Sequence, residues 1–268
     1  MQNGRMRGFP SRHYVTFRSL HPQPLTIAAR LMAPATDAEK SPAVILLHGS
    51  AGPSTREGGY AEALHAAGFV TLEPDLWSAR GLAGGSEGRP NTVPETLPDL
   101  YGARAFLAAR PDVDATRIGV AGFSFGGVMA MLAATRAYND QFLPDAHFAA
   151  LMPVYPACWT YNTVPGHEWR DLVDAPLFIV TGGADQYDDD PSAGEKLLAT
   201  LSPAERARTR THVFAGAHHC FDMPGVDVVV QDPMSHRGTG GDVIMRHDPQ
   251  ATAQSHKLCA AFFSETLK

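Results

Sequence analysis

Short apolar runs alternate with stretches of helical periodicity along most of the chain. Six of the runs are almost wholly apolar, which is typical of strands buried on both faces of a parallel sheet. We therefore expect a parallel core with strands at 43–47, 69–73, 118–122, 149–155, 177–181 and 211–215.

The segments between these runs predict helices. In one of them Leu100, Ala103 and Leu107 repeat at intervals of three and four residues, which places them on one buried face. Strands and helices that alternate in this way give a doubly wound α/β fold, with helices on both faces of the sheet and functional groups at the carboxyl ends of the strands. The expected helices span 60–68, 98–110, 124–137, 194–201 and 251–267.

The mostly parallel sheet is expected to begin with an antiparallel N-terminal edge. The runs at 13–17 and 25–32 are separated by a proline-bearing turn, as in a hairpin. No internal repeat or shift in composition divides the chain, so we expect a single domain over 1–268, with residues 1–12 flexible. The segment 224–248 carries no expected element and is interpreted as a long loop near the active site, or one that reaches a second copy in a homo-oligomer.

Composition and charge exclude several classes of protein. The 268 residues are 44% apolar and 19% charged, which rules out disorder for the bulk of the chain. A net charge of −6 without a long basic run argues against a nucleic-acid partner. There is no apolar run of bilayer length and no signal-peptide pattern, so we expect no membrane partner and a cytoplasmic location. The chain has three widely spaced cysteines, Cys158, Cys220 and Cys259. This pattern matches neither a disulfide framework nor a paired-cysteine zinc site, so we expect reduced thiols.

A candidate nucleophile follows the apolar run at 118–122. Gly122, Ser124 and Gly126 have the GxSxG spacing, between that run and an alanine-rich helical stretch. A sharp turn from strand to helix would hold Ser124 in strained backbone angles, and glycines on either side remove the side chains that would clash. The alternative is a serine that only caps a buried helix.

A second loop, at 48–52, follows an earlier strand and resembles the loops that supply an oxyanion donor in serine hydrolases. The expected donors are the backbone amides of Phe125 and Ser50, with Ala51 as a second choice for the latter. His48 is interpreted as a brace of this loop.

A serine hydroxyl needs an imidazole to accept its proton and a carboxylate to orient that imidazole. Asp185 lies directly beyond a late strand, where the acid belongs in a fold of this order, whereas Asp188 and its two neighbours lie farther out on the loop. His218 and His219 both follow the last strand, and the position alone does not separate them.

Taken together, these motifs resemble those of the dienelactone hydrolase family of α/β-hydrolases. The resemblance implies a triad of Ser124, Asp185 and His219, because the family's GAxHxF pattern selects the second histidine. It also implies hydrolysis of an ester or lactone without a cofactor. The segments that carry it lie, in order, at 46–52, 60–75, 111–127, 182–185 and 216–222.

Two departures from the family pattern bear on the substrate. Dienelactone hydrolases proper have a cysteine where this chain has Ser124, and an acidic residue where it has Gly49. The resemblance therefore implies a serine esterase relative that acts through an acyl-enzyme intermediate, rather than an enzyme for dienelactone itself.

The loops beyond the strand ends supply the expected pocket walls. Trp77, Trp159 and Tyr161 are the candidate substrate-binding residues, because aromatic side chains beside a cleft favour an apolar acyl or alcohol group. The scattered histidines lack HExxH and paired-cysteine contexts, so no metal site is expected. Acyl transfer or peptide cleavage on the same triad, and a non-catalytic binding scaffold, are the alternative functions.

Overall fold

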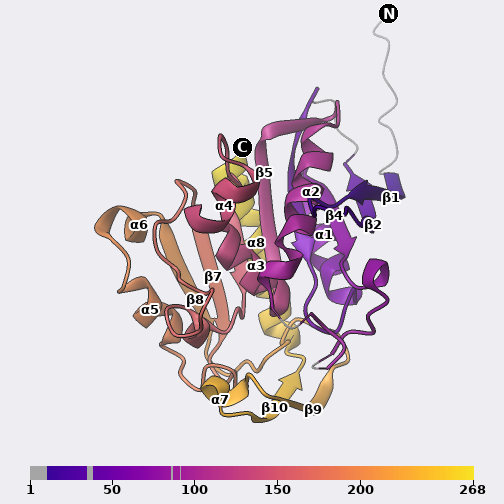
Figure 1. Cartoon of the computed structure of the whole chain (residues 1–268). Coiled ribbons are helices and arrows are strands. Elements are labelled where there is room, and N and C mark those ends of the chain that lie inside the picture. The colour runs from indigo at the N-terminus through magenta and orange to yellow at the C-terminus, as the bar shows by residue number, and fades with distance from the viewer. Residues whose placement is uncertain (1–10, 35–38, 86, 91) are drawn as a thin grey trace, which may run out of the picture.

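The central element is an eight-stranded sheet in the order β1-β2-β4-β3-β5-β6-β7-β8. The computed structural model describes residues 11–34, 39–85, 87–90 and 92–268 (Figure 1). The strands are β1 (Ser11–Arg18), β2 (Thr26–Ala33), β3 (Ser41–Leu47), β4 (Val70–Asp75), β5 (Val113–Phe123), β6 (Leu151–Val154), β7 (Leu177–Gly182) and β8 (Thr209–Phe214). Every strand expected from the apolar runs is present.

The antiparallel and parallel parts of the sheet differ in how deeply their strands are buried. β1, β2 and β4 pair antiparallel, whereas every pairing from β4 across to β8 is parallel. β3 and β7 are buried along their whole length, as interior parallel strands are, while β2 alternates between exposed and buried positions near its start. The expected α/β class, with its antiparallel N-terminal edge, is confirmed. The flexibility expected for 1–12 concerns mainly 1–10, which lie outside the described residues, because β1 begins at Ser11.

Helices cover both faces of the sheet (Figure 1). The apolar residues of α2 and α3 pack into one buried cluster, and those of α1 and α8 pack into a second cluster on the opposite face. No helix in the described ranges combines the length and apolarity that a bilayer span requires. The helices are α1 (Thr55–Ala66), α2 (Leu97–Ala108), α3 (Phe125–Ala133), α4 (Arg136–Phe142), α5 (Ala193–Leu198), α6 (Pro203–Ala207), α7 (Ser235–Gly238) and α8 (Pro249–Leu267).

Two expected elements differ in the structure. The helix expected over 124–137 is interrupted at Thr135, whose φ and ψ of −93° and 141° are extended, so α3 and α4 are separate helices. The segment 224–248 is not a loop: it forms an antiparallel hairpin of β9 (Asp227–Asp232) and β10 (Gly241–Arg246), with α7 between the strands. β-Branched residues in both strands favour this pairing.

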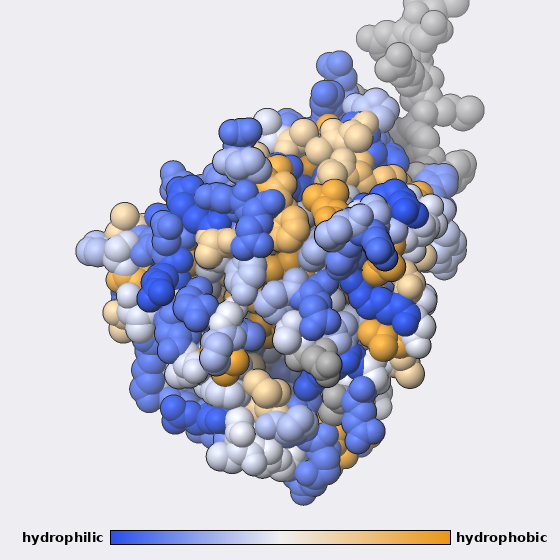
Figure 2. Space-filling view, in the orientation of Figure 1, coloured by the Kyte–Doolittle hydropathy of each residue, from blue (hydrophilic) through white to orange (hydrophobic). Residues whose placement is uncertain are grey.

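The hairpin lies where a functional site is expected. It occupies the bottom of Figure 1, beyond the ends of the parallel strands. Met245 of β10 forms a bridge with His219, and the amide of Arg246 donates to the carbonyl of His219 at 3.2 Å. On the face shown in Figure 2, hydrophilic side chains predominate and hydrophobic ones gather in small groups among them.

Candidate active site

The turn between β5 and α3 holds Ser124 in a conformation that few residues adopt. Its φ and ψ are 52° and −113°, and its side chain does not cap α3, so the simple capping role is excluded. A Cβ added at Gly122 would lie 2.0 Å from the carbonyl oxygen of Gly126, and one at Gly126 would lie 2.4 Å from that of Leu47. Only glycine fits both positions, and the turn therefore projects Ser124 beyond the strand end.

Ser124, His219 and Asp185 form one chain of hydrogen bonds. Ser124 Oγ lies 2.9 Å from His219 Nε2, and His219 Nδ1 lies 2.7 Å from Asp185 Oδ2. With the Nδ1 proton directed at the carboxylate, Nε2 is left to accept the serine hydroxyl. His219 is 1% exposed and Asp185 is 4% exposed, so water competes little for these bonds. His218 does not join the chain, and its Nδ1 is buried without a partner among the described residues.

The other carboxylates of the same loop have different partners. Asp188 accepts the backbone amides of residues 158 and 159 at 3.1 and 2.8 Å. Burial, together with the nearby charge of Asp185, raises the pKa of Asp188 to about 7. Asp189 pairs with a histidine of α7, and Asp190 pairs with a lysine of α5. Asp185 alone among them contacts the imidazole of the chain.

Phe125 and Ser50, the expected oxyanion donors, both border the same cavity as Ser124. Neither the amide of Phe125 nor that of Ser50 has an acceptor within the described residues. Ser50 borders the same cavity as Ser124, whereas Ala51 does not. The amide of Phe125 is also the first of α3, where the helix dipole adds positive potential. Backbone amides without an acceptor are the kind of group that stabilises a negative oxygen.

His48 links the loop of Ser50 to the end of β4. Its Nδ1 donates to the carbonyl of Gly49 at 2.7 Å, and its Nε2 accepts the amide of Leu76 at 3.0 Å. Burial lowers the pKa of His48, which favours the neutral ring that this arrangement requires. The contacts agree with a bracing role for His48.

A cavity of about 350 Å³ opens beside Ser124 and His219. This volume lies at the small end of the range for ligand sites. Aliphatic and proline side chains dominate its walls, among them Val93, Pro94, Val128, Ala157, Val164 and Met234.

The three aromatic residues expected in the walls lie elsewhere. Trp77 is 2% exposed and packs beneath the loop of Ser50, whose carbonyl accepts its indole N–H at 2.9 Å. Trp159 and Tyr161 border a different cavity of about 280 Å³, and the hydroxyl of Tyr161 donates to the carbonyl of Pro156. The expectation is corrected: Trp77 and Tyr161 are buried under the loops, and Trp159 is half-buried beside the other cavity.

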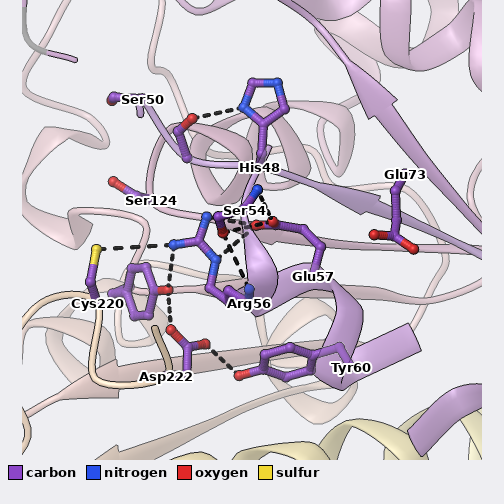
Figure 3. A network of polar contacts seen from close by, with 12 residues as sticks. His48, Ser50, Ser54, Arg56, Glu57, Tyr60, Glu73, Ser124, Cys220 and Asp222 are labelled. Atoms are coloured by element: carbon purple, nitrogen blue, oxygen red, sulfur yellow. Dashed lines mark hydrogen bonds and ion pairs between the residues drawn. The ribbon is translucent and has the colours of Figure 1, made fainter. Parts of the chain in front are cut away.

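A buried polar network beneath Ser124 had no counterpart in the sequence analysis (Figure 3). Arg56 donates to Glu57 Oε1 through Nε and Nη2 at 2.8 and 2.7 Å, and to the hydroxyl of Tyr155 at 3.2 Å. The hydroxyls of Tyr155 and Tyr60 each donate to Asp222 at 2.5 Å. The network thus joins α1 to the loop that carries His219.

The network balances buried charges against each other. Burial alone would raise the pKa of Glu57, but Arg56 and Ser54 outweigh it and lower the pKa below its usual value. For Asp222 burial prevails over the attraction of Arg56, and its pKa is raised. The sequence carries only a local signal of this network: Ser54 and Glu57 have the spacing of a capping box, which they form at the start of α1.

A family model matches residues 27–267, and its description is the dienelactone hydrolase family. The chain belongs to the dienelactone hydrolase family. The resemblance inferred from the motifs is thereby confirmed. Two uncharacterized proteins of Mycobacterium tuberculosis, from strains CDC 1551 and H37Rv, are 30% identical to this family member over 183 residues. The match covers 65% of this chain, and the chain spans 62% of the length of these curated relatives.

Solved structures show the same fold. Dienelactone hydrolase from Anabaena variabilis superposes with a TM-score of 0.65 at 20% identity, covering 97% of this chain and 100% of that one. EstE1, a carboxylesterase cloned from a metagenomic library, superposes with a TM-score of 0.64 at 18% identity. The superposition covers 98% of this chain and 92% of EstE1. At these identities the similarity establishes the α/β-hydrolase fold, which confirms the expected architecture.

Proposed function

We propose that this family member is a serine hydrolase that cleaves small carboxylic esters or lactones through an acyl-enzyme intermediate. The observation that carries the proposal is the hydrogen-bonded chain from Ser124 Oγ through His219 to Asp185, at the edge of a cavity of about 350 Å³. Acyl transfer requires a serine hydroxyl hydrogen-bonded to an imidazole base, with a buried carboxylate that orients the imidazole.

The proposed reaction has two halves that share one base. His219 Nε2 accepts the proton of Ser124 as its oxygen attacks the ester carbonyl, and the amides of Phe125 and Ser50 stabilise the oxyanion. The protonated His219 then gives its proton to the departing alcohol, which leaves an acyl group on Ser124. Water, deprotonated by His219, attacks that acyl group, and the acid is released as Ser124 regains its proton.

Gly49 supports the view that His219 alone activates the nucleophile. A Cβ at Gly49 would lie 3.4 Å from Ser124 Cβ, so a longer side chain there would be directly beside the nucleophile. Glycine offers no carboxylate at that place. A hydroxyl with an imidazole partner does not need one, in contrast to the family members with a cysteine nucleophile.

We propose the cytoplasm as the site of this reaction. The support is that Cys158, Cys220 and Cys259 are all buried and free, as thiols remain in a reducing compartment.

The proposal is tested with a serine-directed fluorophosphonate probe and a series of 4-nitrophenyl esters of rising acyl length. We expect the wild type to be labelled and to release nitrophenol, and Ser124→Ala to do neither. Ser192→Ala, at a half-buried serine next to α5 whose hydroxyl donates to Asp190, serves as the matched control and should behave as the wild type. Labelling that persists in Ser124→Ala would overturn the proposal.

A further inference from the structure

The wall of the cavity beside Ser124 contains one permanently charged side chain among its described lining residues, Arg89. Its charge is already engaged. Nη1 lies 3.1 Å from Asp232 Oδ2, and Nη2 donates to Asp232 Oδ1 at 3.1 Å, so the two side chains meet fork to fork. Nη1 also donates to the hydroxyl of Ser50 at 2.8 Å. The guanidinium therefore faces the site as one half of a neutral pair.

Asp232 is held firmly in this position. Its side chain is 2% exposed at the end of β9, and it accepts the amide of Met234 at 2.8 Å and the hydroxyl of Tyr187. Burial alone would raise its pKa, but the amide of Met234 and the charge of Arg89 outweigh burial and lower it. Asp232 is thus a carboxylate at neutral pH, and the pair carries no net charge.

The same contacts connect the hairpin to the proposed machinery. Tyr187 packs on the ring of His219 with centroids 4.4 Å apart, and Arg89 reaches Ser50, whose amide is a proposed oxyanion donor. Asp232 lies between these two branches. A substrate in the cavity therefore meets a guanidinium whose forked face is already bound by a buried protein carboxylate.

A second carboxylate at this place would be unfavourable. It would have to displace Asp232 from Arg89, which leaves a buried charge unpaired, or approach Asp232 as a like charge. We propose that the Arg89–Asp232 pair makes the site selective for esters that carry no negative charge, and that Asp232 is the specificity-determining residue. This inference rests on the proposed function.

The proposal predicts that Asp232→Asn reverses the selectivity. The variant keeps the shape of the side chain but frees the charge of Arg89 for a substrate. The assay compares kcat/KM for 4-nitrophenyl hydrogen adipate, which has a free carboxylate, with its methyl-capped counterpart, after subtraction of the buffer rate. We expect the wild type to favour the capped ester by about tenfold, and the variant to shift the ratio toward the free acid by clearly more than about tenfold, so that it favours the free acid.

Two further variants assign the effect to the pair. Asp227→Asn lies on the same strand and removes an exposed ion pair with Arg246, so its ratio should equal that of the wild type. Arg89→Gln combined with Asp232→Asn should lose the gained preference, because the freed cation is gone. Thermal unfolding of each variant shows whether the fold is intact.

Each outcome bears on a distinct statement. A wild type that favours the free acid overturns the inference. This measurement needs no variant, so the inference can be refuted even if Asp232→Asn does not fold. Cleavage of both esters with the same ratio in wild type and Asp232→Asn overturns the inference alone. A wild type that cleaves neither ester and is not labelled at Ser124 overturns the proposed function. The inference then falls with it.

Discussion

Removal of the guanidinium from the buried network should leave Glu57 as an unpaired charge. Glu57 is 2% exposed, and its Oε1 accepts two hydrogen bonds from Arg56. Arg56→Met removes both, whereas Ser54 keeps its two hydrogen bonds to Oε2. Breaking a buried ion pair by removing one partner costs about 3–5 kcal/mol. We expect a decrease of that size in the free energy of unfolding at pH 8.

The decrease should depend on pH in one direction. In the wild type the pKa of Glu57 lies below its unfolded value of 4.5, so its contribution to stability is present above that pH and is lost as the pH falls. In Arg56→Met burial prevails and the folded pKa rises above the unfolded one. Its destabilisation then grows as the pH rises from about 4.5. The variant should be closest to the wild type at the acid end.

Urea unfolding followed by tryptophan fluorescence at pH 5 and pH 8 measures both effects. Arg12→Met removes an exposed ion pair to Glu62 of the same helix and should cost less than about 1 kcal/mol, which makes it the matched control. Arg56→Met with Glu57→Gln should recover most of the loss. The reasoning is refuted if Arg56→Met matches the wild type at pH 8, or if the double variant is no more stable than the single one.

Three other changes have defined outcomes. Asp185→Asn should lower kcat for a nitrophenyl ester by roughly 10⁴-fold, because the imidazole loses its orienting carboxylate; a decrease under tenfold would contradict this. Gly122→Ala should abolish fluorophosphonate labelling and lower the Tm, since its Cβ would lie 2.0 Å from a carbonyl oxygen, whereas Gly216→Ala, with open space around it, should do neither. Because the folded pKa of Asp188 is raised to about 7, its contribution to stability should fall as the pH rises from about 4 to 7, so the stability of Asp188→Asn relative to the wild type should increase over that range in unfolding titrations; parallel curves would contradict this.

The strands and the nucleophile turn were predictable because their signals are local. A buried parallel strand must be apolar along its length, and the turn at Ser124 requires glycine at positions that the sequence displays directly. Asp185 followed from its place after β7, and chain order placed both His218 and His219 after β8, whereas the choice of His219 came from the resemblance to the dienelactone hydrolase family. Chain order along a parallel sheet gives these places without any knowledge of packing.

The walls of the cavity and the network beneath it were not predictable in this way. Trp77 could have faced the cavity or the protein, and its packing against the loop of Ser50 depends on how that loop folds. Arg56 and Tyr155 are 99 residues apart, and their contact exists only once α1 lies beside the loop after β6. The hairpin of β9 and β10 was missed because eight residues separate its strands, without a tight turn to mark the pairing.

The central claim is that Ser124 carries the acyl group during turnover. The most direct measurement is mass spectrometry of the protein quenched during hydrolysis of a 4-nitrophenyl ester, followed by peptide mapping. The account predicts an added acyl mass on the peptide that contains Ser124, accumulating with a burst of nitrophenol and absent in Ser124→Ala. Turnover with no acylated peptide, or with the acyl mass on a different residue, would contradict it.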